Sequence, residues 1–346
     1  MNKKTKISVG VITYNQEATI RQMLDSILAQ KGDFDLELVI GEDCSTDATH
    51  AICEEYVNQL KIEDWRLKNA PNAVAINLLP NTHNLGIMAN FARVMKACSG
   101  DYLGICAGDD YWCDELKLQK QLEFFKTHPE VGVVTTSGYR HLVLHDEMVP
   151  GVAPLHPIED GDIKKFYFSP DYKGGVYAMP LTLLIKGELL KYVDFDEYIR
   201  RDFPVEDFPM QAVLAQYAKW GHINDICVVY RVYKESATFI SMDHPKYMLY
   251  HKGLANIRRY LNELFPNDAC FTEEWLQEYE FYKEFLLCLH QLKYKQAKEL
   301  IDEVSKKIPN SAKLKQARRF AKSRIHFLMA HLIKEYKYKQ ELKRRI

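Results

Sequence analysis

The sequence lacks paired cysteines and long apolar runs. Its eight cysteines form no CxxC pair and show no Cys/His spacing suited to zinc, which argues against both a disulfide framework and a zinc fold. No apolar run approaches the ~18 residues that a membrane-spanning helix needs. The apolar segment ISVGVITY is short and continues directly into polar residues, unlike a signal peptide. These absences predict a protein of a reducing, cytoplasmic compartment.

Several motifs of common enzyme classes are also missing. No GxGxxG follows a predicted strand, so a dinucleotide oxidoreductase has little support. The phosphate loop GxxxxGK[ST] is absent, which excludes a P-loop NTPase as far as sequence can. Neither a GxSxG elbow nor an HExxH helix occurs, so nothing indicates a serine hydrolase or a zinc peptidase of these types.

The sequence has almost no net charge, but its charge is unevenly distributed. A formal charge of -1 excludes a strong overall field for nucleic acid. Residues 313–346 nevertheless carry twelve Lys and Arg against two Glu, a local charge of +10, which leaves -11 on the other 312 residues. This basic tail has three interpretations: a solvated helix, a docking site for another protein, or a membrane-surface helix. The last is suggested by apolar residues among the bases, namely Leu314, Phe320, Ile325, Phe327, Leu328 and Leu332.

In the first 110 residues, apolar strand-like segments alternate with helical patterns. Strands are expected in KISVGVITYN, in LELVIG, around 74–79 and in YLGICAG, and helices over 17–29 and 87–97. This alternation predicts a parallel sheet covered by helices on both faces. Ligands of such sheets bind at the carboxyl ends of the strands. The polar clusters TYNQE, GEDCSTD, HNLG and GDD follow those ends, so we expect them to meet along one rim.

The pattern changes towards the C-terminus. From about Met242 onward the sequence is helical, with long stretches free of glycine and of β-branched runs. We therefore predict two domains, an α/β domain over residues 1–240 and a smaller helical region with the basic tail over residues 241–346.

Two adjacent carboxylates, Asp109 and Asp110, follow the apolar run YLGICAG. Side by side they repel each other, so they are either solvated at a turn or hold a cation. Carboxylates suit Mg²⁺ or Mn²⁺ because these hard cations take oxygen ligands, and one or two are enough when diphosphate oxygens supply others. The cluster of acidic, aromatic and amide residues at the strand ends is thus typical of a site for a nucleotide and a divalent metal.

These segments carry a resemblance to a known family. In order, VGVITYNQEATIRQMLDSILAQ, LVIGEDCSTDAT, HNLGIMANFARVMKACSGDYLGICAGDDYW and VEDFPMQAVLAQYAKWGHI, followed by VVYRVYKES, resemble the motifs of family 2 inverting glycosyltransferases. The resemblance covers about residues 6–240. It implies the GT-A fold, a Rossmann-like and mostly parallel sheet flanked by helices. It also implies transfer of a sugar from a nucleotide-diphosphate sugar in a single displacement with inversion.

The resemblance also implies roles for individual residues. Asp110 would be the metal ligand, Asp109 would lie near the ribose, and Asp207 would be the general base with Glu206 beside it. Asp43 would accept a hydrogen bond from the base, and Glu42 stands where the family often has Asp. Other residues assigned to donor binding are Thr13, Tyr14, Asn15, Glu17, Asn84, Gly86 and Arg93. Family members often have a His two residues after the Arg of YR, but Tyr233 stands there, so no third protein ligand is assigned.

The resulting hypothesis is a glycosyltransferase that needs Mn²⁺ or Mg²⁺. Its donor would be a UDP-sugar by default, and its acceptor a growing, lipid-linked surface glycan, reached through peripheral contact with the inner face of the membrane. Two alternatives remain. A sugar-nucleotide nucleotidyltransferase would need a glycine-rich, basic loop after the first strand, which TYNQEAT does not provide. The second alternative is a catalytically inactive binding module. The carboxylates at Asp43, Asp110 and Asp207 argue against it.

Overall fold

The computed structural model describes residues 4–62, 72, 74–151, 163–168, 178–233, 241–268 and 271–345. The chain divides into two compact units. The first contains residues 1–141, 146–167 and 172–231, and the second contains residues 142–145, 168–171 and 232–346. Each unit has a hydrophobic core of its own. The predicted boundary near residue 240 lies outside the described residues, and the division at that position stays a prediction.

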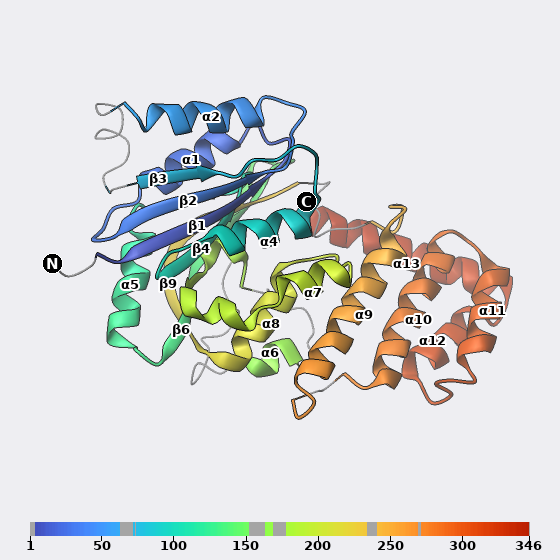
Figure 1. The fold of residues 1–346 in the computed structure, drawn as a ribbon. Coiled ribbons are helices and arrows are strands. Elements are labelled where there is room, and N and C mark those ends of the chain that lie inside the picture. The colour runs from blue at the N-terminus through green and yellow to red at the C-terminus, as the bar shows by residue number, and fades with distance from the viewer. Residues whose placement is uncertain are drawn as a thin grey trace. The chain divides into compact units, whose positions relative to one another are not determined.

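The first unit is built on one nine-stranded sheet (Figure 1). Its described order is β3-β2-β1-β4-β8-β6-β9-β5, with β7 paired to β6. The strands are β1 (Lys6–Thr13), β2 (Asp35–Glu42), β3 (Val74–Leu78), β4 (Tyr102–Ala107), β5 (Tyr111–Trp112), β6 (Val131–Leu142), β7 (Glu147–Pro150), β8 (Leu184–Lys186) and β9 (Lys219–Val232).

The four strands expected from the sequence pair in parallel. In register, Val9 of β1 lies opposite Leu38 of β2 and Gly104 of β4, and β3 continues the parallel ladder beyond β2. Beyond β4 the sheet is mixed, because β8 runs antiparallel to both β4 and β6 and β5 runs antiparallel to β9. The predicted Rossmann-like sheet is therefore confirmed, with antiparallel strands added on one side.

Helices cover both faces of the parallel strands (Figure 1). Helices α1 (Ile20–Leu28) and α2 (Thr49–Gln59) lie on one face and α4 (Ile87–Ala97) on the other. The predicted first helix begins three residues later than expected, because residues 16–19 form a turn in which Thr19 and Ile20 both donate to the carbonyl of Gln16. Gly41 allows α4 to approach β2, since a Cβ there would lie 2.4 Å from a methyl of Val94.

The remaining elements of this unit surround the later strands. They are α5 (Lys117–Thr127), α6 (Lys164–Phe168), the 3₁₀ helices η2 (Pro180–Thr182) and η3 (Gly187–Tyr192), α7 (Phe195–Arg200) and α8 (Asp207–Tyr217). Of these, α5 and η2 share with the sheet, α1 and α2 a core of aliphatic and aromatic side chains. Burial of these side chains supplies most of the driving force for folding.

The described elements of the second unit beyond residue 233 are helices. They are α9 (Tyr247–Leu264), α10 (Glu273–His290), α11 (Tyr294–Val304), α12 (Ala312–Phe320) and α13 (Arg324–Arg345). Phe285 and Leu289 of α10, Ile301 of α11 and Phe327 of α13 meet in its core. The predicted helical C-terminal region is thus confirmed. In the part of the chain that the structure describes, no helix is both long enough and apolar enough to cross a membrane.

Candidate active site

The loop after β1 is tied to the loop after β2. Asn15 adopts a left-handed backbone conformation (φ 52°), donates its N–H to Ser45 and accepts from the N–H of Thr46 at 2.8 Å. Glu17 accepts from the N–H of Ala48 at 2.8 Å. These two predicted site residues thus hold the two strand-end loops together.

Two further residues of the first loop differ in exposure. Thr13 is buried at the end of β1 and donates its hydroxyl to Gln16. Tyr14 is 45 % exposed, and a phenol ring presented in this way offers a surface on which a planar base can stack. The part of the site predicted to bind the nucleotide therefore combines a buried hydroxyl, that of Thr13, with an exposed aromatic side chain, that of Tyr14.

Asp43 organises the loop that precedes α4. Its Oδ1 accepts from Asn81 at 2.9 Å and from the N–H of Leu85 at 2.8 Å, and its Oδ2 accepts from the N–H of Gly86 at 2.9 Å. Asn84 donates back to the carbonyl oxygen of Asp43. A carboxylate offers about four acceptor sites, so one position on Oδ2 remains for a ligand. Asp43, Asn84 and Gly86 are brought together as predicted.

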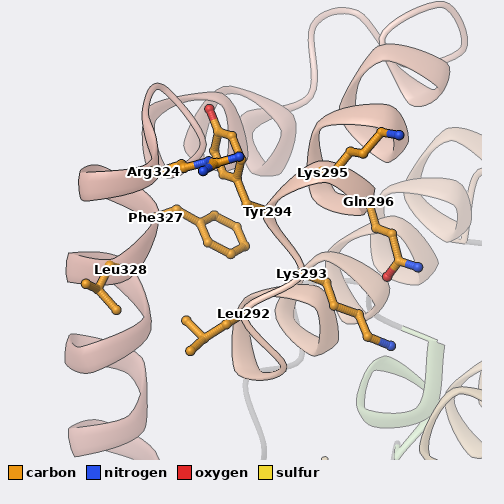
Figure 2. Close-up of a pocket in the computed structure, with 8 residues that line it drawn as sticks. All are labelled: Leu292, Lys293, Tyr294, Lys295, Gln296, Arg324, Phe327 and Leu328. Carbon is orange, nitrogen blue, oxygen red and sulfur yellow. The ribbon is translucent and has the colours of Figure 1, made fainter.

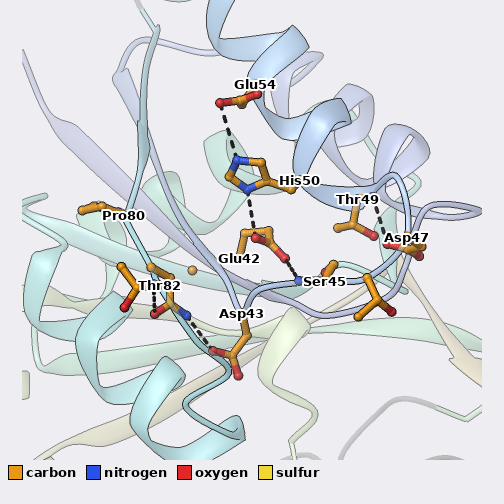
Figure 3. Close-up of polar contacts among 12 residues, drawn as sticks. Glu42, Asp43, Ser45, Asp47, Thr49, His50, Glu54, Pro80 and Thr82 are labelled. Atoms are coloured by element: carbon orange, nitrogen blue, oxygen red, sulfur yellow. Dashed lines mark hydrogen bonds and ion pairs between the residues drawn. The ribbon is translucent and has the colours of Figure 1, made fainter.

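Glu42 is buried beneath this rim (Figure 3). Its Oε1 accepts from the N–H of Ser45 at 2.6 Å, and its Oε2 contacts Nδ1 of His50 at 2.9 Å, while the other ring nitrogen of His50 faces Glu54. These contacts compensate the burial of the Glu42 carboxylate. A Glu here in place of the family's Asp therefore fixes the start of α2.

Arg93 connects α4 to both strand-end loops. Its guanidinium donates to the side chain of Asn90 and to the carbonyl oxygens of Pro80 and Glu42 at 2.8 and 2.9 Å. The amide of Asn90 donates in turn to the carbonyl of Gly41 at 2.7 Å. Three nitrogens of Arg93 are thus used inside the protein, and they hold these loops against α4.

Asp109 and Asp110 lie at the end of β4, beside Arg231 at the end of β9. Asp110 is 3 % exposed and accepts the backbone N–H of Arg231 at 2.8 Å. The guanidinium of Arg231 donates to the carbonyl oxygen of Asp109 and to the side chain of Gln22, and stacks 4.7 Å from the ring centre of Tyr111. One cation therefore faces two carboxylates.

This imbalance changes the proton affinity of both carboxylates. Burial raises the pKa of Asp110 well above its usual range, and the neighbouring Asp109 raises it further. Burial also raises the pKa of Asp109, although Arg231 and a hydrogen bond from Gln16 oppose the shift. A buried and a partly buried carboxylate with one compensating arginine favour the uptake of another positive charge, either protons or a metal ion.

The pair fits a hard divalent cation. Its donors are carboxylate oxygens, the type that Mg²⁺ and Mn²⁺ prefer. Oδ1 of Asp110 is used by Arg231, which leaves Oδ2 of Asp110 and the Asp109 carboxylate to face a cation. No group of three or more His, Cys, Asp or Glu side chains suited to a metal exists among the described residues. A metal bound by this pair would take its remaining ligands from diphosphate oxygens and water.

Gly108 makes the close packing of this corner possible. A Cβ at this position would lie 2.4 Å from Oε1 of Gln16 and 2.6 Å from Oγ1 of Thr13. Its N–H donates to the carbonyl of Ile12, and its carbonyl accepts from the hydroxyl of Thr19. The end of β4 can thus lie against the end of β1 only because residue 108 has no side chain.

The remaining predicted pair, Glu206 and Asp207, lies at the N-terminus of α8. Asp207 is the first residue of the helix and Glu206 precedes it. Burial raises the pKa of both carboxyl groups, and repulsion from Asp207 raises that of Glu206 further, whereas the N–H of Phe208 opposes the shift at Asp207. A carboxylate whose pKa is raised towards neutrality is suited to general base catalysis. No hydrogen bond among the described residues joins this pair to Asp109 or Asp110.

The sequence analysis missed two residues that interact with Asp109 and Asp110. Arg231 and Gln16 were not assigned, yet both interact with the Asp109–Asp110 pair. The available signal for Arg231 was a single cation within the apolar strand VVYRV. Gln16 lies inside TYNQE and gave no signal of its own.

Comparison with known proteins relates the first unit of the chain to one family. Residues 8–147 match the model of glycosyl transferase family 2. An uncharacterized protein of Mycobacterium tuberculosis is 40 % identical over 127 residues, 37 % of this chain and 33 % of its own. The poly(ribitol-phosphate) beta-N-acetylglucosaminyltransferase TarS of Staphylococcus aureus is 29 % identical over 215 residues, 60 % of this chain and 32 % of its own. The chain spans about a third of the length of these curated relatives.

A solved structure shows the same fold. The crystal structure of S. aureus TarS 1-349 in complex with UDP-GlcNAc superposes with a TM-score of 0.53 at 16 % sequence identity, covering 97 % of this chain and 92 % of that one. The family match spans β1 to β4 and includes the rim at their carboxyl ends. Residues 8–147 are thus similar to glycosyl transferase family 2, and the chain shares the fold of the TarS structure, the GT-A fold that the sequence predicted.

Proposed function

We propose that this chain is a metal-dependent inverting glycosyltransferase. It transfers a sugar from a nucleotide-diphosphate sugar to a hydroxyl group of a growing glycan. The observation that carries the proposal is the pair Asp109–Asp110, held at the end of β4 with a single arginine against it. Bound there, Mn²⁺ or Mg²⁺ neutralises the negative charge that develops on a departing diphosphate.

We assign a separate role to each of the residues at the rim. Asp43 keeps one acceptor position for an N–H of the base, and the Tyr14 ring provides a stacking surface. Asp110 holds the metal, and Asp109 lies near the ribose. Asp207 accepts the proton of the acceptor hydroxyl on the face opposite the leaving group, which gives inversion without a covalent intermediate. Glu206 beside it keeps the local proton affinity high.

We propose UDP as the nucleotide and a lipid-linked surface glycan as the acceptor. The relative TarS is named an N-acetylglucosaminyltransferase, and its crystal structure holds UDP-GlcNAc, which supports testing UDP-sugars first. A cytoplasmic setting agrees with the seven described cysteines, all of which are free thiols. Peripheral association with the membrane through residues 313–346 would bring the site to such an acceptor.

The proposal is tested by measuring donor binding directly. We expect UDP-, GDP- and dTDP-sugars to differ in the thermal stabilisation they give, with UDP-sugars the strongest and the effect dependent on Mn²⁺ or Mg²⁺. A ligand at a hundred times its Kd adds about 2.7 kcal/mol to the free energy of unfolding, which is visible as a rise in Tm. If no nucleotide sugar stabilises the protein with either metal, the proposed function is wrong.

A further inference from the structure

Helix α13 has apolar side chains on two opposite faces. One face lies in the core of the helical unit through Phe327 and Ala330. The other carries six large apolar side chains that are exposed: Ile325, Leu328, Met329, Leu332, Ile333 and Tyr336. The sequence had grouped Leu314 and Phe327 with the interfacial residues. The structure buries both in the core of the helical unit, and Met329, Ile333 and Tyr336 join the exposed set.

The exposed residues form one continuous stripe. Their spacing of three and four residues places them on a single side of an α-helix. The stripe extends over twelve residues, and its first and last Cα atoms are separated by about 16 Å along the helix axis. Ile325 at one end is 71 % exposed and Tyr336 at the other is 66 % exposed. A contiguous apolar surface of this kind marks an interaction site, because scattered exposed apolar residues would not share one face.

A pocket adjoins the stripe at its N-terminal end (Figure 2). It has a volume of about 540 Å³, and its lining includes Arg324 and Leu328 from α13. Leu292, Tyr294 and Phe327 supply the rest of its apolar wall. Leu292 is 50 % exposed and adopts a left-handed backbone conformation (φ 55°) in the turn between α10 and α11. Such a conformation is unfavourable for a branched side chain, so this turn presents a leucine where glycine or asparagine would fit more easily.

The charges around this surface are positive. Lys293 and Lys295 lie at the pocket on the α11 side and Arg324 on the α13 side (Figure 2). Within the described residues, neither Lys293 nor Arg324 forms an ion pair, and Lys295 lies 3.8 Å from Glu299. Glu335 of α13 is engaged by His290 at 2.5 Å. Lys315, Lys322 and Lys337 are exposed nearby in the sequence and add to the local excess of bases.

We infer that the α13 stripe, together with Leu292 and the cationic pocket, is a surface that inserts into an anionic lipid bilayer. An apolar stripe bordered by bases lies in the plane of the lipid headgroups, with the apolar side chains among the upper acyl chains. Lys293, Lys295 and Arg324 then contact lipid phosphates. The inference deepens the membrane part of the proposed function by naming the surface and the lipid charge it requires.

The test uses the full-length protein and vesicles without donor or acceptor, so its failure would leave sugar transfer untouched. Binding is measured by co-sedimentation with vesicles of phosphatidylcholine alone and of phosphatidylcholine with 30 % phosphatidylglycerol. We expect binding to the anionic vesicles that weakens steeply with added salt. The double variant Leu328→Ser/Leu332→Ser should lower the partition coefficient about tenfold or more, because each removes a large apolar side chain from the bilayer.

A matched control and a second variant keep the result unambiguous. Leu249 of α9 is as exposed as Leu332, at 60 %, and Leu249→Ser should leave vesicle binding unchanged. Leu292→Gly should weaken binding while it relieves the left-handed strain. Equal binding to neutral and anionic vesicles would overturn the inference. So would unaltered binding by the double variant. If sedimentation velocity instead shows a dimer that this variant dissociates, with no vesicle binding, the stripe is an interface between two copies of the chain.

Discussion

Arg231 contacts the carboxylate pair twice, through its backbone N–H to Oδ1 of Asp110 at 2.8 Å and through its guanidinium to the carbonyl oxygen of Asp109 at 2.5 Å. The first contact joins the end of β9 to the residues that follow β4. The second places one positive charge beside two negative ones, of which Asp110 is buried and Asp109 partly buried. The arginine therefore fixes the geometry of the pair but leaves it short of positive charge, which a divalent cation would supply.

Asp110→Asn should separate metal binding from stability. The amide keeps the shape of the carboxylate and still accepts the N–H of Arg231, while it removes repulsion from Asp109. We expect an unchanged or higher free energy of unfolding at pH 7 and loss of Mn²⁺-dependent UDP binding, measured by thermal denaturation and isothermal titration calorimetry. Asp33→Asn, at an exposed carboxylate, is the control. Unchanged dependence of UDP binding on Mn²⁺ would contradict the metal assignment.

Gly108→Ala should disturb the site by steric means. The added methyl would lie 2.4 Å from Gln16 and 2.6 Å from Thr13, so the loop after β1 has to move. Overpacking of this kind costs about 1–3 kcal/mol, and donor binding should weaken because the loop carries Tyr14 and Asn15. Gly104→Ala on the same strand is the matched control, since its Cβ would meet Trp112 at an ordinary 3.4 Å. Equal donor affinity in the two variants would contradict the proposed close packing.

The first four strands of the sheet could be predicted from the sequence because each is a short apolar run followed by polar residues. Val9 and Leu38 have neighbours on both sides in the ladder, and burial on both faces demands such continuous runs. Two strands on the antiparallel side of the sheet, β8 and β5, gave weaker signals. β8 has three residues and β5 has two, lengths at which periodicity carries no information.

The sequence predicted which residues lie at the candidate site, but it did not predict the hydrogen bonds between them. Acidic and amide residues at strand ends indicated a rim, since parallel strands end at a common edge. The three hydrogen bonds that the Asp43 carboxylate accepts come from the loop before α4, so they depend on the path of residues 81–86. The contact of Arg231 with Asp110 joins residues 121 positions apart. Such a pairing is a property of the folded sheet and cannot be derived from local pattern.

His290 should make the stability of the helical unit depend on pH. Burial disfavours its charged form, but hydrogen bonds to Asp243 and Glu335 outweigh this effect and raise its pKa. The extra stability is therefore present in full below the ordinary pKa of about 6.5. It is lost as the pH rises through the raised pKa of the folded state.

His290→Gln is expected to lower the free energy of unfolding by about 1.5–3 kcal/mol at pH 6, nearer the lower value because Asp243 is largely exposed. The difference from the wild type should shrink at pH 9, as measured by urea denaturation at both pH values. His326→Gln, at an exposed histidine of α13, should show no such trend. A loss that is equal at both pH values would mean that His290 acts through packing and not through charge.

Asp207→Asn tests the proposed general base. Burial raises the pKa of Asp207, so in the wild type the active, deprotonated form increases with pH and transfer should rise to a plateau above that pKa. The amide cannot accept a proton, and kcat should fall by ~10²–10⁴ with this pH dependence removed. Donor and metal affinity should stay nearly constant, because Asp207 does not contact the metal position. A metal ligand would behave differently, since its loss weakens donor binding and turnover together.

Glu206→Gln provides the comparison, and this variant should retain most of the turnover. If Asp207→Asn instead shows near-normal turnover and Glu206→Gln a large loss, the general base is Glu206.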